Sequence, residues 1–318
     1  MLFVSKASPA FSHAGGRRRT DAAEETEAVR VDVKERLREA GFFRVIALDA
    51  AEAGAQEGRT LLLALWAYGA EETPDPGEAW IHPYYFASQK AYRAASALAR
   101  ESRAEGGSLR LADELRVKPI FARLPGFAQG RNTLSYLTRV GSRFHAQLLL
   151  TDDALPPDLT VAAVPHPLMC ASCRRCLAAC PTGALDEAGF HREKCLRNWM
   201  LSGKTVPEAL RGHMGSRLIG CDDCQRCCPY NTPPRESAEG VLPLMELLRD
   251  ARGLSPRLGE AIGANLAIPN RVLSQSCLLA GCSGRAELSQ ALAPLESHPS
   301  PVVREHAAWA RERLRRGK

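Results

Sequence analysis

The chain has 318 residues, of which 45% are hydrophobic and 25% charged, a composition typical of a soluble globular protein with two or three domains. The formal charge of +6 permits an anionic partner such as RNA but does not require one. No apolar run approaches the roughly 18 residues that a membrane span needs, and the N-terminus lacks the apolar core of a secretory signal. We therefore expect a cytoplasmic protein without a membrane segment.

The first part of the chain alternates predicted helices and strands. We expect residues 1–25 to be a disordered leader, or an overextended start of the reading frame. Helical and strand-like apolar spacings then follow one another as far as position 150. The predicted elements are a helix at 27–40, strands at 43–48 and 60–66, a helix at 84–103, and a further helix and strand within 110–150. Such alternation predicts an α/β domain over residues 26–165.

The second part of the chain changes character twice. Residues 166–240 hold most of the cysteines, and residues 241–318 read as short helices broken by Gly and Pro, of which the clearest begins at Pro301. Paired short helices of this kind predict HEAT-like helical repeats. The predicted fold class is therefore a multidomain α+β or α/β protein, with an N-terminal α/β domain, a ferredoxin-like domain and a helical-repeat domain.

Nine of the eleven cysteines lie between Cys170 and Cys228, in two runs that each end in Cys-Pro. The first run has the spacing Cys-x2-Cys-x2-Cys-x3-Cys-Pro, and the second, which starts at Cys221, has the spacing Cys-x2-Cys-x3-Cys-Pro. This is the ligand pattern of a ferredoxin-type domain with two [4Fe–4S] clusters. A single tetrahedral zinc site would need fewer cysteines. The sequence therefore predicts two [4Fe–4S] clusters in this segment.

The spacing also predicts which cysteine binds which cluster, because in two-cluster ferredoxins the fourth cysteine of each run binds the other cluster. The first cluster is expected to take four ligands: Cys170, Cys173, Cys176 and Cys228. The second is expected to take three ligands from the runs and one more: Cys180, Cys221 and Cys224. Cys195 is favoured as the eighth ligand because the second run is one cysteine short, and Cys227 competes for that position. Cys277 and Cys282 lie in the helical tail, where we expect buried free thiols.

The second run lies in a longer motif. The segment GHMGSRLIGCDDCQRCCPYN, which ends at Asn231, resembles the Ile-Gly-Cys-Asp-Asp-Cys-Gln…Cys-Pro-Trp-Asn segment of the epoxyqueuosine reductases, and CASCRRCLAACPTGAL, which starts at Cys170, resembles their first run. Gly130-Arg131-Asn132-Thr133 is similar to their Gly-Lys-Asn-Thr, Gly141-Ser142 to their Gly-Ser, and residues 298–310 to their helical tail. The chain thus resembles this family from about residue 30 to 316, most clearly after residue 130.

The resemblance implies a set of cofactors, contacts and partners. In this family, cobalamin in the N-terminal domain faces one cluster and acts on the epoxide of a modified base, which completes queuosine in tRNA. The family's ligand assignment matches the one given above, with Cys195 as the eighth ligand. The resemblance implies the following cofactor contacts: Arg131, Asn132, Thr133, Ser142 and Asp222. It implies tRNA and a low-potential electron donor such as ferredoxin or flavodoxin as partners, and we expect a monomer.

The expected proton donor is where this chain departs from the family. Expelling the epoxide oxygen requires a general acid, which in the family is an aspartate upstream of Gly-Lys-Asn-Thr. In this chain, the residue at the same sequence distance before Gly130 is Leu111. Asp113 is the nearest suitable carboxylate, and a solvated side chain is the alternative interpretation. Arg131 in place of the family's lysine changes the hydrogen-bonding geometry at that position.

Two other functions and several smaller alternatives stay open at the level of sequence. The chain could be a two-cluster electron-transfer or corrinoid-activating protein, or a cobalamin-dependent reductase of another molecule. Asp222 and Asp223 could face the corrin or cap a short helix. His82, Tyr84 and Tyr85 could stack on a base or corrin, or pack at a helix start. The basic C-terminal residues could contact tRNA phosphates or form a solvated helix end.

Overall fold

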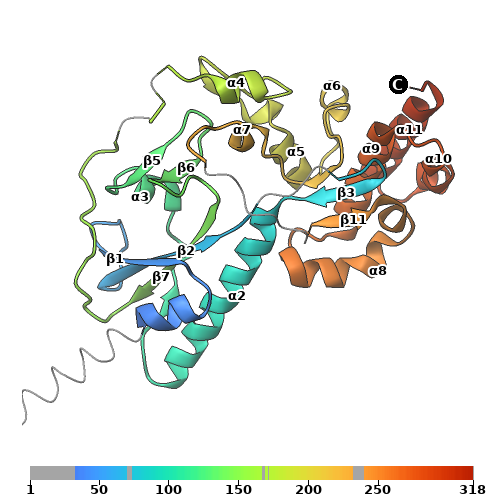
Figure 1. The fold of residues 1–318 in the computed structure, drawn as a ribbon. Coiled ribbons are helices and arrows are strands. Elements are labelled where there is room, and N and C mark those ends of the chain that lie inside the picture. Colours follow the sequence, from blue (N-terminus) through green and yellow to red (C-terminus); the bar gives the residue numbers. More distant parts are fainter. Residues whose placement is uncertain (1–32, 70–73, 167–168, 171, 232–239, 318) are drawn as a thin grey trace, which may run out of the picture.

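The computed structural model describes residues 33–69, 74–166, 169–170, 172–231 and 240–317 (Figure 1). The predicted leader, residues 1–25, and the start of the first predicted helix lie outside these residues. The described part of that helix covers residues 33–39, which agrees with the prediction for that stretch. None of the helices in the described ranges is long and apolar enough to cross a membrane.

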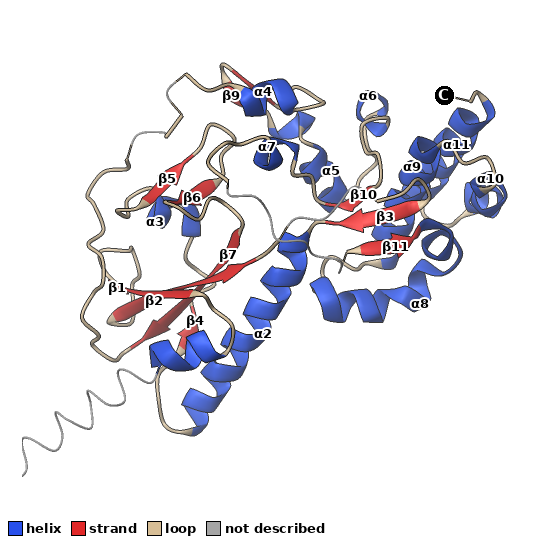
Figure 2. Ribbon diagram, in the orientation of Figure 1, coloured by secondary structure: helices blue, strands red, loops and turns tan. Residues whose placement is uncertain are grey.

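A four-stranded antiparallel sheet forms the N-terminal part of the molecule (Figure 2). Its order is β1-β2-β7-β4, with these bounds: β1 Arg44–Asp49, β2 Thr60–Ala67, β7 Phe144–Thr151 and β4 Arg110–Leu111. The mixed α and β content was predicted, and the strand at 60–66 was predicted to within one residue. The assignment to the α/β class was not correct for this sheet, because strands that run antiparallel belong to an α+β arrangement.

Alternation along β2 explains how the sheet is buried on both faces. Leu61, Leu63 and Leu65 contribute to one core, whereas Leu62 and Ala64 contribute to the other. Successive side chains of a strand point to opposite faces, so an unbroken apolar run requires a cover on each side.

The two covers have different structures. The long helix α2, Pro83–Ala104, lies across one face and packs there together with residues 33–39 (Figure 1). The other face is covered by α3, Val117–Phe121, and by the hairpin of β5, Phe127–Gln129, and β6, Ser135–Leu137. The loop between β5 and β6 also contacts the cysteine-rich segment, because the side chain of Asn132 donates to the carbonyl of Cys224.

A second sheet joins segments that are far apart in the sequence. Its central strand β3, Glu78–Ile81, pairs in parallel with β10, Arg217–Ile219, and antiparallel with β11, Val241–Pro243. The hydrogen bonds of this sheet therefore cross the predicted boundaries near residues 165 and 240. They fix the segment that precedes Cys221 against the start of α2.

The cysteine-rich segment consists of short elements joined by turns. The helices are α4 Arg175–Ala179, the 3-10 helix η1 Arg192–Lys194, α5 Leu196–Ser202, α6 Glu208–Arg211 and α7 Asp223–Arg226. A small hairpin comprises β8, Leu185–Asp186, and β9, Gly189–Phe190. α4 packs against α7, so the two cysteine runs meet at these two helices.

The C-terminal part is helical, as predicted. Its elements are α8 Leu244–Ile262, α9 Pro269–Ser283, α10 Leu288–Leu292, the 3-10 helix η2 Ala293–Ser297 and α11 Pro301–Arg315. α9 packs against both α8 and α11, and one continuous core joins these helices to β3 and α5. Whether these helices form HEAT-like repeats stays a prediction. Several arginines of the basic tail are ion-paired within the chain: Arg311 with Glu296, and Arg315 and Arg316 with Glu312.

Candidate functional site

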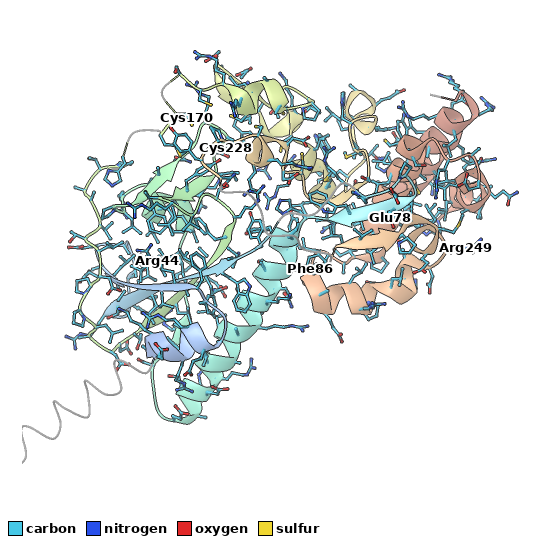
Figure 3. All side chains as sticks on the ribbon, in the orientation of Figure 1. Arg44, Glu78, Phe86, Cys170, Cys228 and Arg249 are labelled. Atoms are coloured by element: carbon cyan, nitrogen blue, oxygen red, sulfur yellow. The ribbon has the colours of Figure 1, made fainter. Side chains whose placement is uncertain are left out.

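The cysteines of the two runs gather into two groups. We call Cys170, Cys173, Cys176 and Cys228 the outer thiols, and Cys180, Cys195, Cys221 and Cys224 the inner thiols. Two of the outer thiols, Cys170 and Cys228, are labelled in Figure 3. Burial raises the pKa of Cys176, and the charges of the other outer thiols raise it further. Burial likewise raises the pKa of Cys224, to which the other inner thiols and Cys176 add. The thiols that raise the pKa of Cys176 belong to its own group, and those that raise the pKa of Cys224 are the other inner thiols and Cys176. The assignment of each group to one cluster stays a prediction.

The competing cysteine lies with the outer group. Burial raises the pKa of Cys227 to about 11, and the thiols that add to this effect are Cys176, Cys228 and Cys173. Its own thiol donates to the carbonyl of Cys224 at 3.7 Å. Cys195 instead lies among the inner thiols, which would otherwise number three.

Backbone amides already point at two of the thiols. The amide of Arg131 donates to Sγ of Cys170 at 3.4 Å, and that of Ala184 donates to Sγ of Cys180 at 3.2 Å. Hydrogen bonds to sulfur are among the interactions that set the potential of iron–sulfur clusters. No three His, Cys, Asp or Glu side chains of the described ranges form a group that could hold a metal ion. A [4Fe–4S] cluster differs from a single metal ion, because its four thiolate ligands bind four separate iron atoms and need not converge on one centre.

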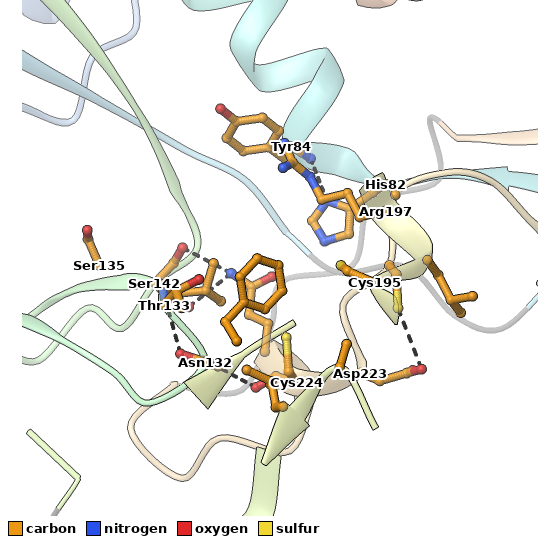
Figure 4. Close-up of a pocket in the computed structure, with 18 of the residues that line it drawn as sticks. His82, Tyr84, Asn132, Thr133, Ser135, Ser142, Cys195, Arg197, Asp223 and Cys224 are labelled. Carbon is orange, nitrogen blue, oxygen red and sulfur yellow. Dashed lines mark hydrogen bonds between the residues drawn. The ribbon is translucent and has the colours of Figure 1, made fainter. Parts of the chain in front are cut away.

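A cavity of about 380 Å³ opens beside the inner thiols, all four of which line it (Figure 4). Including its open mouth, the space is about 1530 Å³. The outer thiols, all of which the structure describes, are absent from its lining. The remaining walls come from the N-terminal sheet, the start of α2, α3, the hairpin of β5 and β6, the hairpin of β8 and β9, and α5. The cavity is of the size of small-molecule sites and lies where three parts of the fold meet.

One wall of the cavity is aromatic and carries a cation. Tyr84 makes edge-to-face contacts with Tyr68, Tyr85 and His145, at ring distances of 5.8, 5.4 and 5.5 Å. The guanidinium of Arg197 lies 5.9 Å from the ring of Tyr84 and 5.8 Å from that of Tyr85, and its Nε donates to the Tyr85 hydroxyl at 3.0 Å. The prediction that these aromatic residues pack at a helix start is therefore confirmed for Tyr84 and Tyr85, which also line the cavity. Stacking on a base or corrin stays a prediction.

Gly220 brings this wall against the inner thiols. Its backbone has φ +98°, a conformation that favours glycine, and a Cβ there would lie 2.5 Å from Cβ of His82. The amide of His82 also donates to the carbonyl of Ile219 at 2.9 Å. The residue before Cys221 must therefore be small for the second run to reach the start of α2.

Gln225 ties the second cysteine run to the sheet. Its side-chain amide donates to the hydroxyl of Tyr68 at 2.9 Å and to the carbonyl and hydroxyl of Ser142 at 3.0 and 2.9 Å. Asn231 accepts from the amide and hydroxyl of Ser142 and donates to the carbonyl of Gln225. The position of Ser142 at the cavity is therefore fixed from the cysteine side.

Asn132 makes the equivalent connection from the Gly-Arg-Asn-Thr segment. Its side-chain amide donates to the hydroxyl of Tyr136 and to the carbonyl of Cys224, both at 2.8 Å, and its oxygen accepts from the amide of Leu134. The next residue, Thr133, has φ 63°, which is a strained conformation for a β-branched side chain. The contacts of Asn132 hold this strained residue at the cavity, where both residues are part of the lining.

Not all of the predicted cofactor contacts lie at the cavity. Asn132, Thr133 and Ser142 line it, whereas Arg131 and Asp222 do not. Arg131 is paired with Glu187 at 3.3 Å, and the buried carboxylate of Asp222 accepts from Arg226 at 2.9 Å. Asp222 stands at the N-terminus of α7, yet its side chain makes no capping hydrogen bond.

The charged groups of the lining are few. Asp223 is the carboxylate among them, and both of its oxygens accept from Arg217, at 2.8 and 2.9 Å. Lys118 and Arg197 are the cations. Asp113, the carboxylate favoured as the proton donor, is exposed in the turn after β4 and is not part of the lining.

Two histidines of the cavity are kept neutral. Burial lowers the pKa of both His82 and His145 to about 4. Nδ1 of His145 lies 3.3 Å from the Tyr84 hydroxyl, and its Nε2 is buried without a partner in the described residues. A buried nitrogen of this kind is expected to hydrogen-bond to a ligand or to water.

Sequence reasoning missed several residues of this site. Tyr68, Lys118, His145 and Arg197 come from four separate segments, and nothing in their local sequence marks them as neighbours. Gln225 could have been found, because it belongs to the Cys-Asp-Asp-Cys-Gln motif and a polar residue beside cluster ligands has few structural reasons to be there.

Comparisons with known proteins agree with this geometry. Residues 169–231 match a family described as "4Fe-4S double cluster binding domain". The epoxyqueuosine reductase of Bacillus subtilis (strain 168) is 29% identical over 198 residues, which are 58% of this chain and 49% of that protein. That of Alicycliphilus denitrificans is 32% identical over 205 residues, which are 57% of this chain and 54% of that protein. The chain thus spans about half the length of the curated relatives it matches.

The fold is also similar to solved structures. A crystal structure of epoxyqueuosine reductase with a tRNA-TYR epoxyqueuosine-modified tRNA stem loop has a TM-score of 0.71 to this chain, at 19% identity and 91% coverage of both chains. The Bacillus subtilis enzyme, in a structure with its aspartate catalytic loop swung out of the active site, has a TM-score of 0.69 at 20% identity and the same coverage. These similarities establish a mixed α and β fold, together with a segment that matches the double-cluster domain.

Proposed function

We propose that this chain, which belongs to the epoxyqueuosine reductase family, reduces epoxyqueuosine to queuosine in tRNA. The observation that carries the proposal is the cavity beside the inner thiols, since it joins a redox centre to a space large enough for a ligand. The oxidoreductase activity, the tRNA substrate and the cytoplasmic location are parts of this proposal.

The outer and inner thiols would each hold one [4Fe–4S] cluster. Three features support this assignment: the two groups have four cysteines each, the pKa of Cys176 and that of Cys224 are raised by the other thiols of their own groups, and amides already donate to Cys170 and Cys180. Iron in these clusters prefers soft thiolate ligands, and no other residue type in the two groups is needed to complete them.

Cobalamin would bind in the cavity, with its corrin facing the inner cluster. The residues present fit such a group, because neutral polar side chains suited to amide substituents, Asn132, Thr133, Ser135 and Ser142, line the space together with the aromatic wall. When bound, the cofactor supplies a low-valent cobalt that can reduce a strained carbon–oxygen bond. Arg131 and Asp222 would then act on the site through their charges rather than by contact.

The overall reaction defines what the protein has to deliver. Conversion of an epoxide to an alkene consumes two electrons and two protons and releases one water. Each cluster passes one electron at a time, so a low-potential donor such as ferredoxin or flavodoxin would reduce the outer cluster first, and the inner cluster would pass electrons to the cavity. Cavity side chains would have to provide at least one of the two protons.

The test uses cells that lack this gene. We expect their tRNA to accumulate epoxyqueuosine, and a plasmid copy of the wild-type chain to restore queuosine. A copy with Cys195→Ala should not restore it, whereas Cys282→Ala, which alters a half-buried thiol of α9 that bonds to the carbonyl of Arg211, should. Purified protein that holds about eight irons but takes up no corrin would favour the two-cluster electron-transfer function instead. Normal queuosine in the deletion strain would refute the proposal.

A further inference from the structure

We propose that Lys118 is the general acid that protonates the oxygen leaving the epoxide. This inference rests on the proposed function, and it assigns to a lysine of α3 the task that falls to an aspartate in the family. Lys118 is the proton donor of the described lining whose side chain is not engaged by another residue.

Carboxylates are excluded first. Asp223 is the carboxylate of the described lining, and both of its oxygens accept hydrogen bonds from Arg217. A carboxylate engaged by a guanidinium in this way is not free to act on a ligand. Asp113 is exposed outside the cavity, so its carboxylate does not reach a ligand bound there in this conformation.

The other candidate donors are also committed or in the wrong state. His82 and His145 are neutral, because burial lowers the pKa of each to about 4. The hydroxyl of Tyr68 accepts from Gln225, and that of Tyr85 accepts from Arg197. Burial raises the pKa of both tyrosines and makes them weaker acids. Burial also raises the pKa of Tyr84, whose hydroxyl lies against His145.

Lys118 differs from all of these groups. It lines the cavity from the second position of α3, and its ammonium makes no hydrogen bond or ion pair to any residue in the described ranges. Lys118 is exposed overall, but the part of its side chain against the cavity is desolvated, which lowers the pKa of its ammonium, and the positive charge of Arg197 on α5 lowers that pKa further. The other titratable groups of the lining are tyrosines and histidines, the four inner thiols and one carboxylate: Tyr68, Tyr84, Tyr85, His82, His145 and Asp223. That carboxylate is paired with Arg217 and not with Lys118. The ammonium of Lys118 is therefore a stronger acid than that of an ordinary lysine.

The proton balance of the reaction is then as follows. Two electrons enter through the clusters, the first carbon–oxygen bond breaks, and the ammonium of Lys118 gives its proton to that oxygen and becomes a neutral amine. The second carbon–oxygen bond breaks as the alkene forms, and the oxygen leaves as water after taking a second proton from solvent at the open mouth of the cavity. A further solvent proton restores the ammonium, so that two protons and two electrons are consumed in each turnover.

The test compares Lys118→Met and Lys118→Arg with Lys204→Met, a matched change of an exposed lysine after α5 that does not line the cavity. The substrate is an anticodon stem loop that carries epoxyqueuosine, and each protein is first checked for about eight irons and for bound corrin. We expect kcat of Lys118→Met to fall by at least about 100-fold, with KM little changed. Arginine keeps the charge but cannot release a proton at neutral pH, so Lys118→Arg should also be slow.

The dependence of the rate on pH provides a second measurement. An acid works only while it is protonated, so wild-type kcat should fall as pH rises through the lowered pKa of Lys118, below 10.5. This alkaline decrease should be absent from Lys118→Met. A third measurement is acetylation of substrate-free protein over a range of pH values, followed by mass spectrometry. We expect Lys118 to be labelled at a lower pH than the lysine of an unstructured peptide.

Each outcome is decisive. If wild type is active and Lys118→Met is within twofold of it, or if Lys118→Arg restores the rate, Lys118 is not the proton donor and the proposed function stands. If Lys118 is acetylated over the same pH range as the lysine of the unstructured peptide, its pKa is not lowered and its role as the general acid is overturned. If wild type holds clusters and corrin but does not reduce the stem loop, the proposed function fails, and the role of Lys118 in that reaction fails with it.

Discussion

The outer and inner thiols have the same ligand chemistry but different surroundings. Both groups contain four cysteines contributed by the two runs or the stretch between them, and either group could hold a cubane. Only the inner group opens onto the cavity, and burial raises the pKa of its Cys221 to about 12. The outer group instead lies beside Arg131, Glu187 and Arg174, which form ion pairs near the surface.

This difference indicates a direction for electron flow. A cluster held by the outer thiols would be close to a docking electron donor, whereas one held by the inner thiols would be close to a ligand in the cavity. The two groups have the same ligands, but their different surroundings give them different expected roles in electron transfer. Changing one cysteine in each group tests the two roles separately.

Loss of one ligand from each group should give the largest effects and should distinguish the groups. We expect Cys224→Ser and Cys173→Ser each to lower the iron content from about eight to about four per chain. With a small chemical reductant, Cys173→Ser should keep substantial activity because the inner cluster survives. Cys224→Ser should lose at least about 100-fold with any reductant, since no cluster faces the cavity. Iron analysis and stem-loop turnover with dithionite and with ferredoxin provide the measurements.

The opposite pattern would reverse the proposed direction. If Cys173→Ser were inactive with dithionite while Cys224→Ser kept its activity, the outer cluster would be the one that serves the reaction, and the cavity would not be the active site.

A smaller effect is expected from the contacts that hold the inner group in place. Asn132→Leu removes hydrogen bonds to Tyr136 and to the carbonyl of Cys224 and leaves buried polar groups without partners. We expect it to lower the free energy of unfolding by about 1–3 kcal/mol. Asn198→Leu is the matched control, because the side chain of Asn198 accepts one exposed hydrogen bond, from Arg192, and loss of that bond should cost less than about 0.5 kcal/mol.

Urea unfolding of the cluster-loaded proteins measures both changes. Equal losses for the two variants would mean that the contacts of Asn132 contribute no more than an exposed hydrogen bond, and that the position of the inner group is set elsewhere.

The sequence predicted the elements and the cysteine sets but not how distant segments meet. Apolar alternation located β2 and the periodic apolar face located α2, because both patterns are local. The antiparallel order of the first sheet and the pairing of β3 with β10 depend on contacts across long stretches of chain, which no local pattern encodes. The assumption that alternating elements form an α/β sheet failed for this reason.

The same limit applies to the site. Cluster ligands are close in sequence because one short segment has to wrap a small body, so their spacing is informative. The cavity is different, since Tyr68, Lys118, His145 and Arg197 reach it from four elements or their ends. The proton donor was sought by its distance from Gly130, which led to an exposed turn, whereas α3 places Lys118 at the cavity seven residues closer to that glycine than Leu111.

Cys227 provides the smallest and most specific test of the two groups. It is adjacent in sequence to Cys228, and the thiols nearest to it electrostatically belong to the outer group, which already has four members. We therefore expect Cys227→Ser to keep about eight irons and to retain turnover within about twofold of wild type, whereas Cys228→Ser should lose about four irons. Iron analysis and the visible absorbance of the clusters measure both variants. Loss of four irons in Cys227→Ser, together with full iron content in Cys195→Ser, would show that Cys227 and not Cys195 is the eighth ligand. The division into outer and inner thiols would then be wrong.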